Sequence, residues 1–414
     1  MDTFVEELQN NPIFQLSLSS KELFHSNFLA WLAEDKNTRG IFNQLMRVWL
    51  NDPDWKYNPQ GMEVKREYNH FDFCVCDKYS FNETSVTGNV KVVLENKFKS
   101  IAYKSQLLNY KNRTKTLNEE AYKNKFEAEK KQQGDSKARL PRNWRDKVEQ
   151  TDMKYILLTL AKDFLDKDSI KELGWTIVPY SEYSKLLREN LKLITDDFYH
   201  NIIEHYCDFI DIFSAHLNDC LNNIKITDGW DILKRADFAS IRCNDVWQKL
   251  VMHKCAMELG EKLKDCSLPV IVSCDKEIWG KNGTENKDKL FLVVNFFHSE
   301  AMFELKYLIP GKGIFALQQQ GAHPLRVGFL DMTSPKPRFS KKDDIANWNK
   351  EAKRIIEEAG IGEEIIPMKN VQEESKDLYN SYGTFYYNEY TGERKNIGDT
   401  LDEMVAIIKK VIKQ

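Results

Sequence analysis

Residues 70–98 read HFDFCVCDKYSFNETSVTGNVKVVLENKF, and they contain the clearest strand pattern in the chain. Apolar residues, mainly Val and Phe, recur with a period near two on both sides of NETSVTGN, a segment typical of a turn. The preceding MEVKREY (62–68) shows the same alternation. Together these segments predict a meander of three β-strands.

Helical patterns flank this meander. KELFHSNFLAWLAED (21–35) and IFNQLMRVWL (41–50) place apolar side chains at helical spacing, and another helix is expected to begin near Ala102. Strand character returns in KYILLTLA (154–161) and in GWTIVPYS (174–181), which leads into a helix. This order of elements predicts an α/β core within the first 180 residues.

The rest of the chain divides by composition. Residues 111–150 are highly charged and poor in aliphatic side chains, which predicts an exposed helical insertion. Helical patterns continue to about residue 263, and strand patterns dominate afterwards. We therefore expect an α/β domain at 1–190 that carries the insertion, a helical connector at 191–265, and an α+β domain at 266–414.

Composition limits the class of protein. The chain has 414 residues, of which 42% are hydrophobic, so it is expected to fold into a globular core. A formal net charge of -3 argues against a uniformly basic nucleic-acid coat, although a local basic surface stays compatible with it. The start, MDTFVEELQN, is no secretory signal, and no apolar run suggests a membrane partner. Eight cysteines without a CxxC pair predict free thiols and a cytoplasmic protein.

The meander also carries the residues that suggest chemistry. Asp72 interrupts an apolar strand, where a carboxylate is costly unless it has a partner. Glu95 and Lys97 share one strand face, and a hairpin would bring Asp72 beside Glu95. Two carboxylates suit Mg²⁺ or Mn²⁺, and the ammonium could orient a water or neutralise a pentacovalent phosphate. A structural ion pair between strands would have the same sequence, so that alternative stays open.

Several short motifs along the first 190 residues occur in an order found in a known family. They are E-x-x-H-S-x-x-L-A-W-L (Glu22 to Leu32), Arg66–Glu67, FDF around Asp72, E-N-K (Glu95 to Lys97) and Q-L-x-x-Y (Gln106 to Tyr110). This combination resembles the PD-(D/E)xK nuclease superfamily, in particular a bacterial branch with that N-terminal helix. The resemblance implies a restriction-endonuclease-like fold, in which a mixed central sheet is flanked by helices.

The resemblance also implies roles for individual residues. Asp72 and Glu95 would bind the metal ion, Lys97 would assist catalysis, and Glu22 would complete the metal site. Gln106, on the helix after E-N-K, would lie close to them. The implied cofactor is Mg²⁺ or Mn²⁺.

The chain departs from the branch at three places. A-E-D (33–35) replaces L-D-P after L-A-W-L, Arg39–Gly40 replaces H-G, and Phe71 stands where the superfamily signature has proline. None of these positions is an implied metal ligand. They leave the identity of the substrate open.

The charged insertion offers a surface for nucleic acid. Between residues 97 and 150, fifteen Lys or Arg residues stand against seven Asp or Glu residues. Such an excess suits phosphate contacts, for which the candidates are Lys130, Lys131, Arg139 and Arg142. A solvated helical hairpin would have the same composition, and no motif for reading bases is present.

The pattern favours a metal-dependent endo- or exonuclease in bacterial defence or repair, with DNA expected ahead of RNA as the substrate. The alternative is a catalytically silent nucleic-acid-binding or scaffold protein that keeps the nuclease fold. The presence of Asp72, Glu95 and Lys97 together counts against a protein without catalytic activity. The α+β domain at 266–414 lacks such a cluster, so we expect it to choose the target or contact a protein partner.

Overall fold

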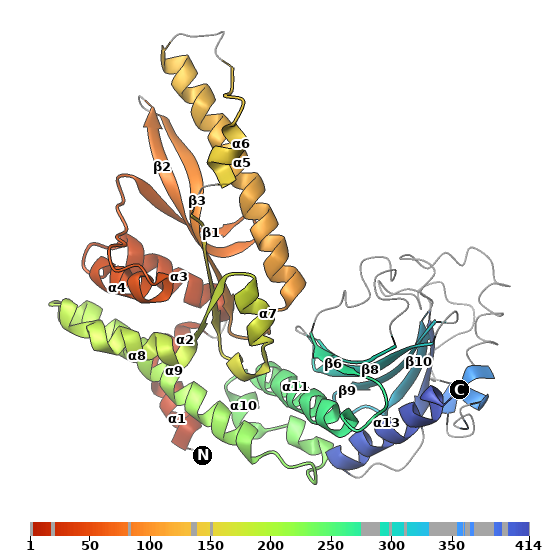
Figure 1. The fold of residues 1–414 in the computed structure, drawn as a ribbon. Helices are drawn as coiled ribbons and strands as arrows, with labels where there is room; N and C mark the ends of the chain where they lie inside the picture. The colour runs from red at the N-terminus through yellow and green to blue at the C-terminus, as the bar shows by residue number, and fades with distance from the viewer. Residues whose placement is uncertain are drawn as a thin grey trace. The chain divides into compact units, whose positions relative to one another are not determined.

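The computed structural model describes residues 3–17, 21–81, 84–133, 139–149, 152–274, 290–297, 300–309, 313–330, 354–358, 360, 365–367, 385–390 and 396–413. The chain forms two compact units, Met1–Asn218 and Asp219–Gln414 (Figure 1). The three domains expected from sequence stay a prediction. None of the described helices combines enough length with enough apolar character to span a membrane.

A five-stranded sheet forms the centre of the first unit, in the order β1-β2-β3-β4-β5. The first three strands are antiparallel, which is the predicted meander, and β3, β4 and β5 run parallel. The fold is therefore the predicted α/β class with a mixed central sheet. The strands are β1 (Met62–Tyr68), β2 (Phe71–Phe81), β3 (Thr84–Lys97), β4 (Lys154–Thr159) and β5 (Trp175–Pro179).

Helices cover both faces of this sheet. Helix α3 (Lys21–Glu34) packs against β1, β2 and β3, and α5 (Lys104–Gln133) packs against β2 and β3 from the opposite face. The alternation of side chains along β3 shows this division, because Asn96 bonds to α3 whereas Glu95 bonds to α5. The unit also contains α1 (Thr3–Asn10), α2 (Pro12–Ser17), α4 (Arg39–Leu50), α6 (Trp144–Glu149), α7 (Lys167–Glu172), α8 (Tyr180–Asn190), α9 (Asp197–Asn223) and the 3₁₀ turns η1 (Lys162–Phe164) and η2 (Leu191–Leu193).

The charged insertion is helical, as its composition predicts. Helix α5 runs unbroken for 30 residues. The short α6 lies against it, with the ring of Trp144 stacked 6.1 Å from the ring of Tyr122. The buried positions of α5 recur every three or four residues, so one stripe of the helix faces the sheet.

One side chain of α5 completes the edge of β3. The parallel pairing of β3 with β4 begins at Val92, so Val90 has no β4 residue beside it. The Asn118 Oδ1 atom accepts a hydrogen bond from the Val90 N–H at 2.7 Å, and Asn118 Nδ2 donates to the Val90 carbonyl at 3.2 Å. Asn118 is fully buried and therefore acts as a strand partner at this point.

The second unit contains a seven-stranded sheet in the order β11-β12-β10-β9-β8-β7-β6. Helix α11 (Asn244–Leu263) packs on β6, β7 and β8, and α13 (Ile397–Ile412) packs on α11 and β8, which agrees with the predicted α+β class. Residues 354–358 are also helical. The other elements are η3 (Trp230–Leu233), α10 (Ala236–Ser240), β6 (Val270–Ser273), β7 (Leu292–Phe296), β8 (Met302–Ile309), β9 (Gly313–Gln320), β10 (Arg326–Leu330), β11 (Ile365–Pro367) and β12 (Phe385–Tyr390).

We predict that Asn118→Ala lowers the free energy of unfolding by about 2 kcal/mol or more, because it leaves a buried N–H and a buried carbonyl of Val90 without partners. Denaturant unfolding measures this loss. Asn112→Ala is the matched control, since Asn112 lies on the same helix with an exposed side chain. Equal losses in the two variants would show that Asn118 does not support the strand.

Candidate metal and catalytic site

The structure brings Asp72, Glu95 and Lys97 together at one end of the sheet. Phe73 of β2 pairs with Leu94 of β3, and this register places Asp72 opposite Glu95. The Lys97 Nζ atom lies 2.7 Å from Glu95 Oε1. The backbone N–H of Asn96 donates to Asp72 Oδ2 at 2.7 Å. The hairpin predicted from sequence thus places two carboxylates and an ammonium in one cluster.

Glu95 is held by one of its two carboxylate oxygens. Its side chain is almost completely buried, and Oε1 accepts hydrogen bonds from Gln106 Nε2 and the Tyr110 hydroxyl, both at 3.1 Å, in addition to the contact with Lys97. Among the described residues, the buried Oε2 has no hydrogen-bond partner. A carboxylate fixed through one oxygen therefore presents the other to whatever enters the site.

Glu22 joins this cluster from α3. Its Oε1 accepts from the backbone N–H of Lys99 at 2.9 Å and from Ser100 Oγ at 3.1 Å. Both donors lie within three residues of the end of β3, so they tie the first turn of α3 to this end of the strand. The negative charge of Glu22 also contributes to raising the pKa of Asp72 and of Glu95. Glu22 thus lies at the end of β3, and its role as a metal ligand stays a prediction.

Burial and mutual repulsion control the charges of the site. Burial and then the charge of Glu95 raise the pKa of Asp72 to about 8, although the Asn96 N–H and Lys97 act in the opposite direction. Burial also raises the pKa of Glu95 despite the nearby Lys97. Burial of Lys97 opposes its charge, but the attraction of Glu95 prevails and raises the pKa of Lys97. Without a cation, the cluster therefore favours a proton on Asp72 near neutral pH.

These residues fit a divalent cation with hard ligands. Glu22, Asp72 and Glu95 supply carboxylate oxygens. The Oε2 atom of Glu95 is buried away from solvent and accepts no hydrogen bond from the described residues. Oxygen donors of this kind suit Mg²⁺ or Mn²⁺. The nearby His25 is not counted among the ligands, because its ring packs among those of Phe98, Tyr180 and Phe209 and its Nδ1 is hydrogen-bonded to the Tyr206 hydroxyl at 2.8 Å.

Three partners of the cluster were absent from the predicted site. Tyr110 donates to Glu95, Asn96 bonds to Asp72 through its backbone, and the Tyr180 hydroxyl donates to Asn96 Oδ1. The contact of Tyr110 could have been predicted from sequence, because Tyr110 follows Gln106 by one helical turn in the Q-L-x-x-Y motif. Tyr180 lies 84 positions from Asn96, and no pattern in the chain links the two.

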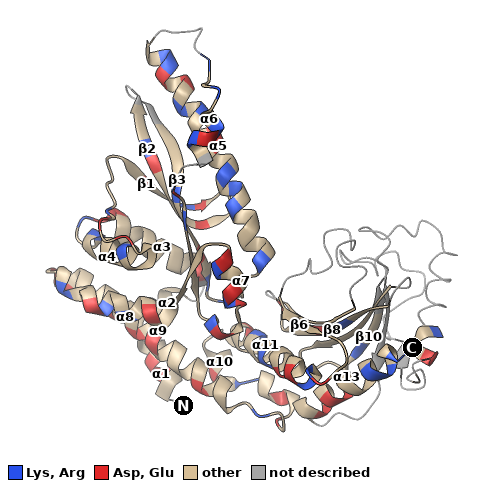
Figure 2. Cartoon of the chain, viewed as in Figure 1, with Lys and Arg blue, Asp and Glu red and all other residues tan. Residues whose placement is uncertain are grey.

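Two of the candidate phosphate contacts, Lys130 and Lys131, lie at the end of α5, in its last turn. The other two, Arg139 and Arg142, precede α6, which lies back along α5. Lys131 also lines a groove of about 740 Å³ between α5 and β3, together with Glu120 and Glu127. The groove therefore has mixed charge, and Lys and Arg residues lie along the whole length of α5 (Figure 2).

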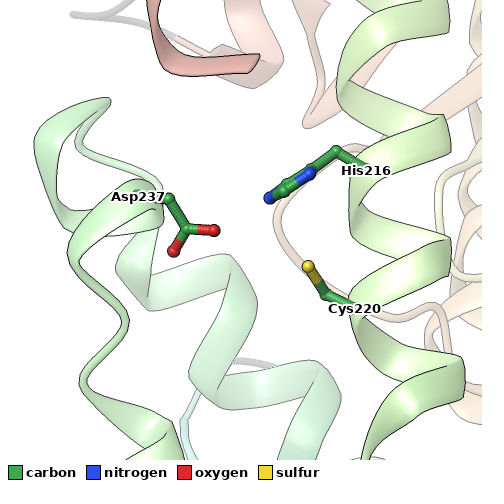
Figure 3. A group of neighbouring side chains, drawn as sticks. All are labelled: His216, Cys220 and Asp237. Atoms are coloured by element: carbon green, nitrogen blue, oxygen red, sulfur yellow. The ribbon is translucent and has the colours of Figure 1, made fainter. Parts of the chain in front are cut away.

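A second group of side chains has the types that bind metals. His216 and Cys220 lie one turn apart on α9, and the three possible ligand atoms of these residues and Asp237 of α10 lie within 4.8 Å of one another (Figure 3). Both carboxylate oxygens of Asp237 accept hydrogen bonds from Arg235, at 3.0 and 2.6 Å. This carboxylate is already neutralised by a guanidinium, so we assign no metal to the group.

Comparison with known proteins gives a family match within the first unit. Residues 11–208 match a family model described as the PD-(D/E)XK nuclease superfamily, which confirms the resemblance seen in the sequence. Neither a curated protein nor a solved structure matches the chain. The matched segment contains Glu22, Asp72, Glu95, Lys97 and Gln106.

The raised pKa of Asp72 predicts a pH-dependent stability in the absence of metal. A carboxyl group that takes up its proton more readily in the folded protein stabilises the fold at low pH, and this contribution is lost as the pH rises toward about 8. Asp72→Asn cannot ionise. In EDTA, its melting temperature should therefore exceed that of the wild type by an increasing margin between pH 5.5 and pH 8.5.

Thermal melts at a series of pH values measure this margin. Asp77→Asn is the control, because Asp77 lies on the same strand but is paired with Lys91, outside the cluster. A margin for Asp72→Asn that stays constant or shrinks with rising pH would contradict the described electrostatics.

Proposed function

We propose that this protein is a metal-dependent nuclease that hydrolyses phosphodiester bonds in DNA, because residues 11–208 match the family model of the PD-(D/E)XK nuclease superfamily. The observation that carries the proposal is the buried Glu95, whose Oε2 has no partner while Oε1 accepts from three donors. A structural ion pair would satisfy both oxygens. A ligand position would keep one oxygen open.

Each residue has a part in this chemistry. Asp72, Glu95 and Glu22 would hold Mg²⁺ or Mn²⁺, which supplies Lewis-acid stabilisation and a water of lowered pKa when bound. Gln106 and Tyr110 orient Glu95 through its other oxygen. Lys97 stays charged and can stabilise negative charge that develops on the phosphate or orient the attacking water.

The alternative is a silent nucleic-acid-binding or scaffold protein with the same fold. Such a protein gains nothing from burying Asp72 and Glu95 next to each other, since burial raises the pKa of both and weakens the fold when they ionise. Replacement of either carboxylate would relieve that cost. Retention of both carboxylates and Lys97 therefore favours the catalytic function.

We predict that Asp72→Asn, Glu95→Gln and Lys97→Ala each reduce Mg²⁺- or Mn²⁺-dependent cleavage by about a hundredfold or more, the effect of losing one preorganised charge. Plasmid, linear duplex, single-stranded DNA and RNA substrates should be compared, with and without EDTA. Mn²⁺ should raise the melting temperature of the wild type and of Lys97→Ala more than that of either carboxylate variant, because only the carboxylates are proposed ligands.

Two substitutions serve as controls for this set. Asp77→Asn and Lys91→Ala remove charges from the same two strands away from the cluster, so both should cleave like the wild type. Cleavage that persists in excess EDTA would contradict the metal requirement. Equal Mn²⁺-induced shifts in the wild type and Asp72→Asn would contradict the proposed ligands.

The insertion is proposed to contact the backbone of the substrate. Replacing Lys130, Lys131, Arg139 and Arg142 by Ala should weaken binding and lower the log–log salt slope by roughly one per lost phosphate contact. Lys130 lies 24 residues beyond Gln106 on α5, roughly 36 Å along the helix axis. This distance is about one turn of duplex DNA. The loss should therefore disappear on duplexes that extend less than about ten base pairs toward the insertion.

Salt titrations of binding on long and short duplexes test this expectation. The matched control replaces four exposed lysines outside the insertion, Lys36, Lys56, Lys171 and Lys192. A salt slope that is unchanged in the insertion variant, or equally changed in both variants, would assign the insertion another role.

A further inference from the structure

Asn96 divides the chemistry of β3 between the two faces of the sheet. Its neighbours Glu95 and Lys97 point toward α5, whereas the Asn96 side chain points toward α3 and α8 and is completely buried. Its backbone N–H nevertheless serves the site, because it donates to Asp72 Oδ2 at 2.7 Å. Asn96 thus contacts the cluster through its backbone, while its side chain contacts α3 and α8.

The Asn96 carboxamide has a partner on each side. Its Nδ2 donates to the backbone carbonyl of Glu22 at 2.7 Å, and its Oδ1 accepts from the Tyr180 hydroxyl. The orientation follows from the chemistry, since a carbonyl can only accept and must face the amide N–H. The hydroxyl of Tyr180, which lies at the start of α8 and is fully buried, must then be the donor.

These bonds connect every element that carries a proposed ligand. Glu22 is tied to β3 twice, through its carbonyl to Asn96 and through its carboxylate to the Lys99 N–H. Asp72 is tied to β3 through the Asn96 N–H. Asn96 therefore lies at the meeting point of α3, β2 and β3, and Tyr180 fixes the rotation of its carboxamide.

We propose that Asn96 and Tyr180 are positioning residues of the metal site, which hold Glu22, Asp72 and Glu95 at the separations that the cation needs. This inference rests on the proposed function. Neither side chain is among the proposed metal ligands. Tyr180 acts only through Asn96, and Asn96 acts through the Glu22 backbone and its own strand.

The residue types agree with this role. An aspartate at position 96 would lack the donor for the Glu22 carbonyl and would add a fourth carboxylate to the neighbourhood. A leucine would leave both that carbonyl and the Tyr180 hydroxyl without partners. Asparagine supplies a donor and an acceptor without a charge, which is what a residue between these partners requires.

The test is Mn²⁺ binding by titration calorimetry to the full-length protein, with cleavage measured in parallel. Tyr180→Phe removes one hydroxyl. It should raise the Kd for Mn²⁺ by roughly tenfold, which is the effect expected when a residue that orients the metal ligands through hydrogen bonds is lost. Tyr183→Phe is the matched control. Tyr183 lies on the same helix and is as deeply buried, but it is not bonded to Asn96, so its Kd should stay within about twofold of the wild type.

A double-mutant cycle separates positioning from general stability. If Tyr180 acts through Asn96, the double variant Asn96→Ala/Tyr180→Phe should have the same Kd for Mn²⁺ as Asn96→Ala alone. If the two residues acted independently, their losses of binding free energy would add. Additive effects, or equal losses of affinity in Tyr180→Phe and Tyr183→Phe, would overturn the inference even if the wild type cleaves DNA. Asp72-dependent Mn²⁺ binding without cleavage would overturn the proposed function alone. Absence of Asp72-dependent binding in the wild type would overturn both.

Discussion

The buried contact between Glu95 and Lys97 is the interaction on which the N-terminal unit depends. A carboxylate with almost no exposed surface is tolerated only when an opposite charge and further donors lie within reach. Lys97 supplies the charge, and α5 supplies Gln106 and Tyr110. The start of α5 must therefore lie over the end of β3. This requirement fixes the position of the charged insertion, because the insertion is the continuation of the same helix.

The alternation of β3 extends this constraint to the opposite face. Because Glu95 and Lys97 face α5, Asn96 must face α3, where its carboxamide meets the Glu22 carbonyl. His25, three residues after Glu22, then fills the space behind the strand, with its ring 4.3 Å from the ring of Phe98. The E-x-x-H-S motif thus combines a proposed ligand, Glu22, with residues that pack α3 against the sheet. His25 has a structural role, and its lowered pKa keeps it neutral there.

The sequence was sufficient to predict the elements and the centre of the site, because both depend on local periodicity. Strand period two placed Glu95 and Lys97 on one face, and the hairpin between two strand patterns placed Asp72 beside them. Glu22 and Gln106 required the family resemblance, since nothing local in α3 or α5 points toward β3. The Asn118 and Tyr180 contacts were not predictable, because side-chain bonds across 28 and 84 positions leave no periodic trace. The insertion was predicted as a basic helix, yet Glu120 and Glu127 line the groove beside it, because net charge does not specify which face carries which residue.

The site is also the place where function and stability oppose each other. The charges of Glu95 and Glu22 raise the pKa of Asp72, and the charge of Glu22 also raises the pKa of Glu95, so the cluster without a cation is least favourable when all three are ionised. Lys97 offsets part of that repulsion but, as one charge among three carboxylates, cannot offset all of it. A proton on Asp72 relieves the remainder in the absence of metal, and a divalent cation would relieve it with two charges instead of one. A proton and a metal ion thus compete for the same negative charge, which couples occupancy of the site to pH. The Asn96 N–H contributes to this balance without adding charge, because it stabilises ionised Asp72 and so lowers its pKa.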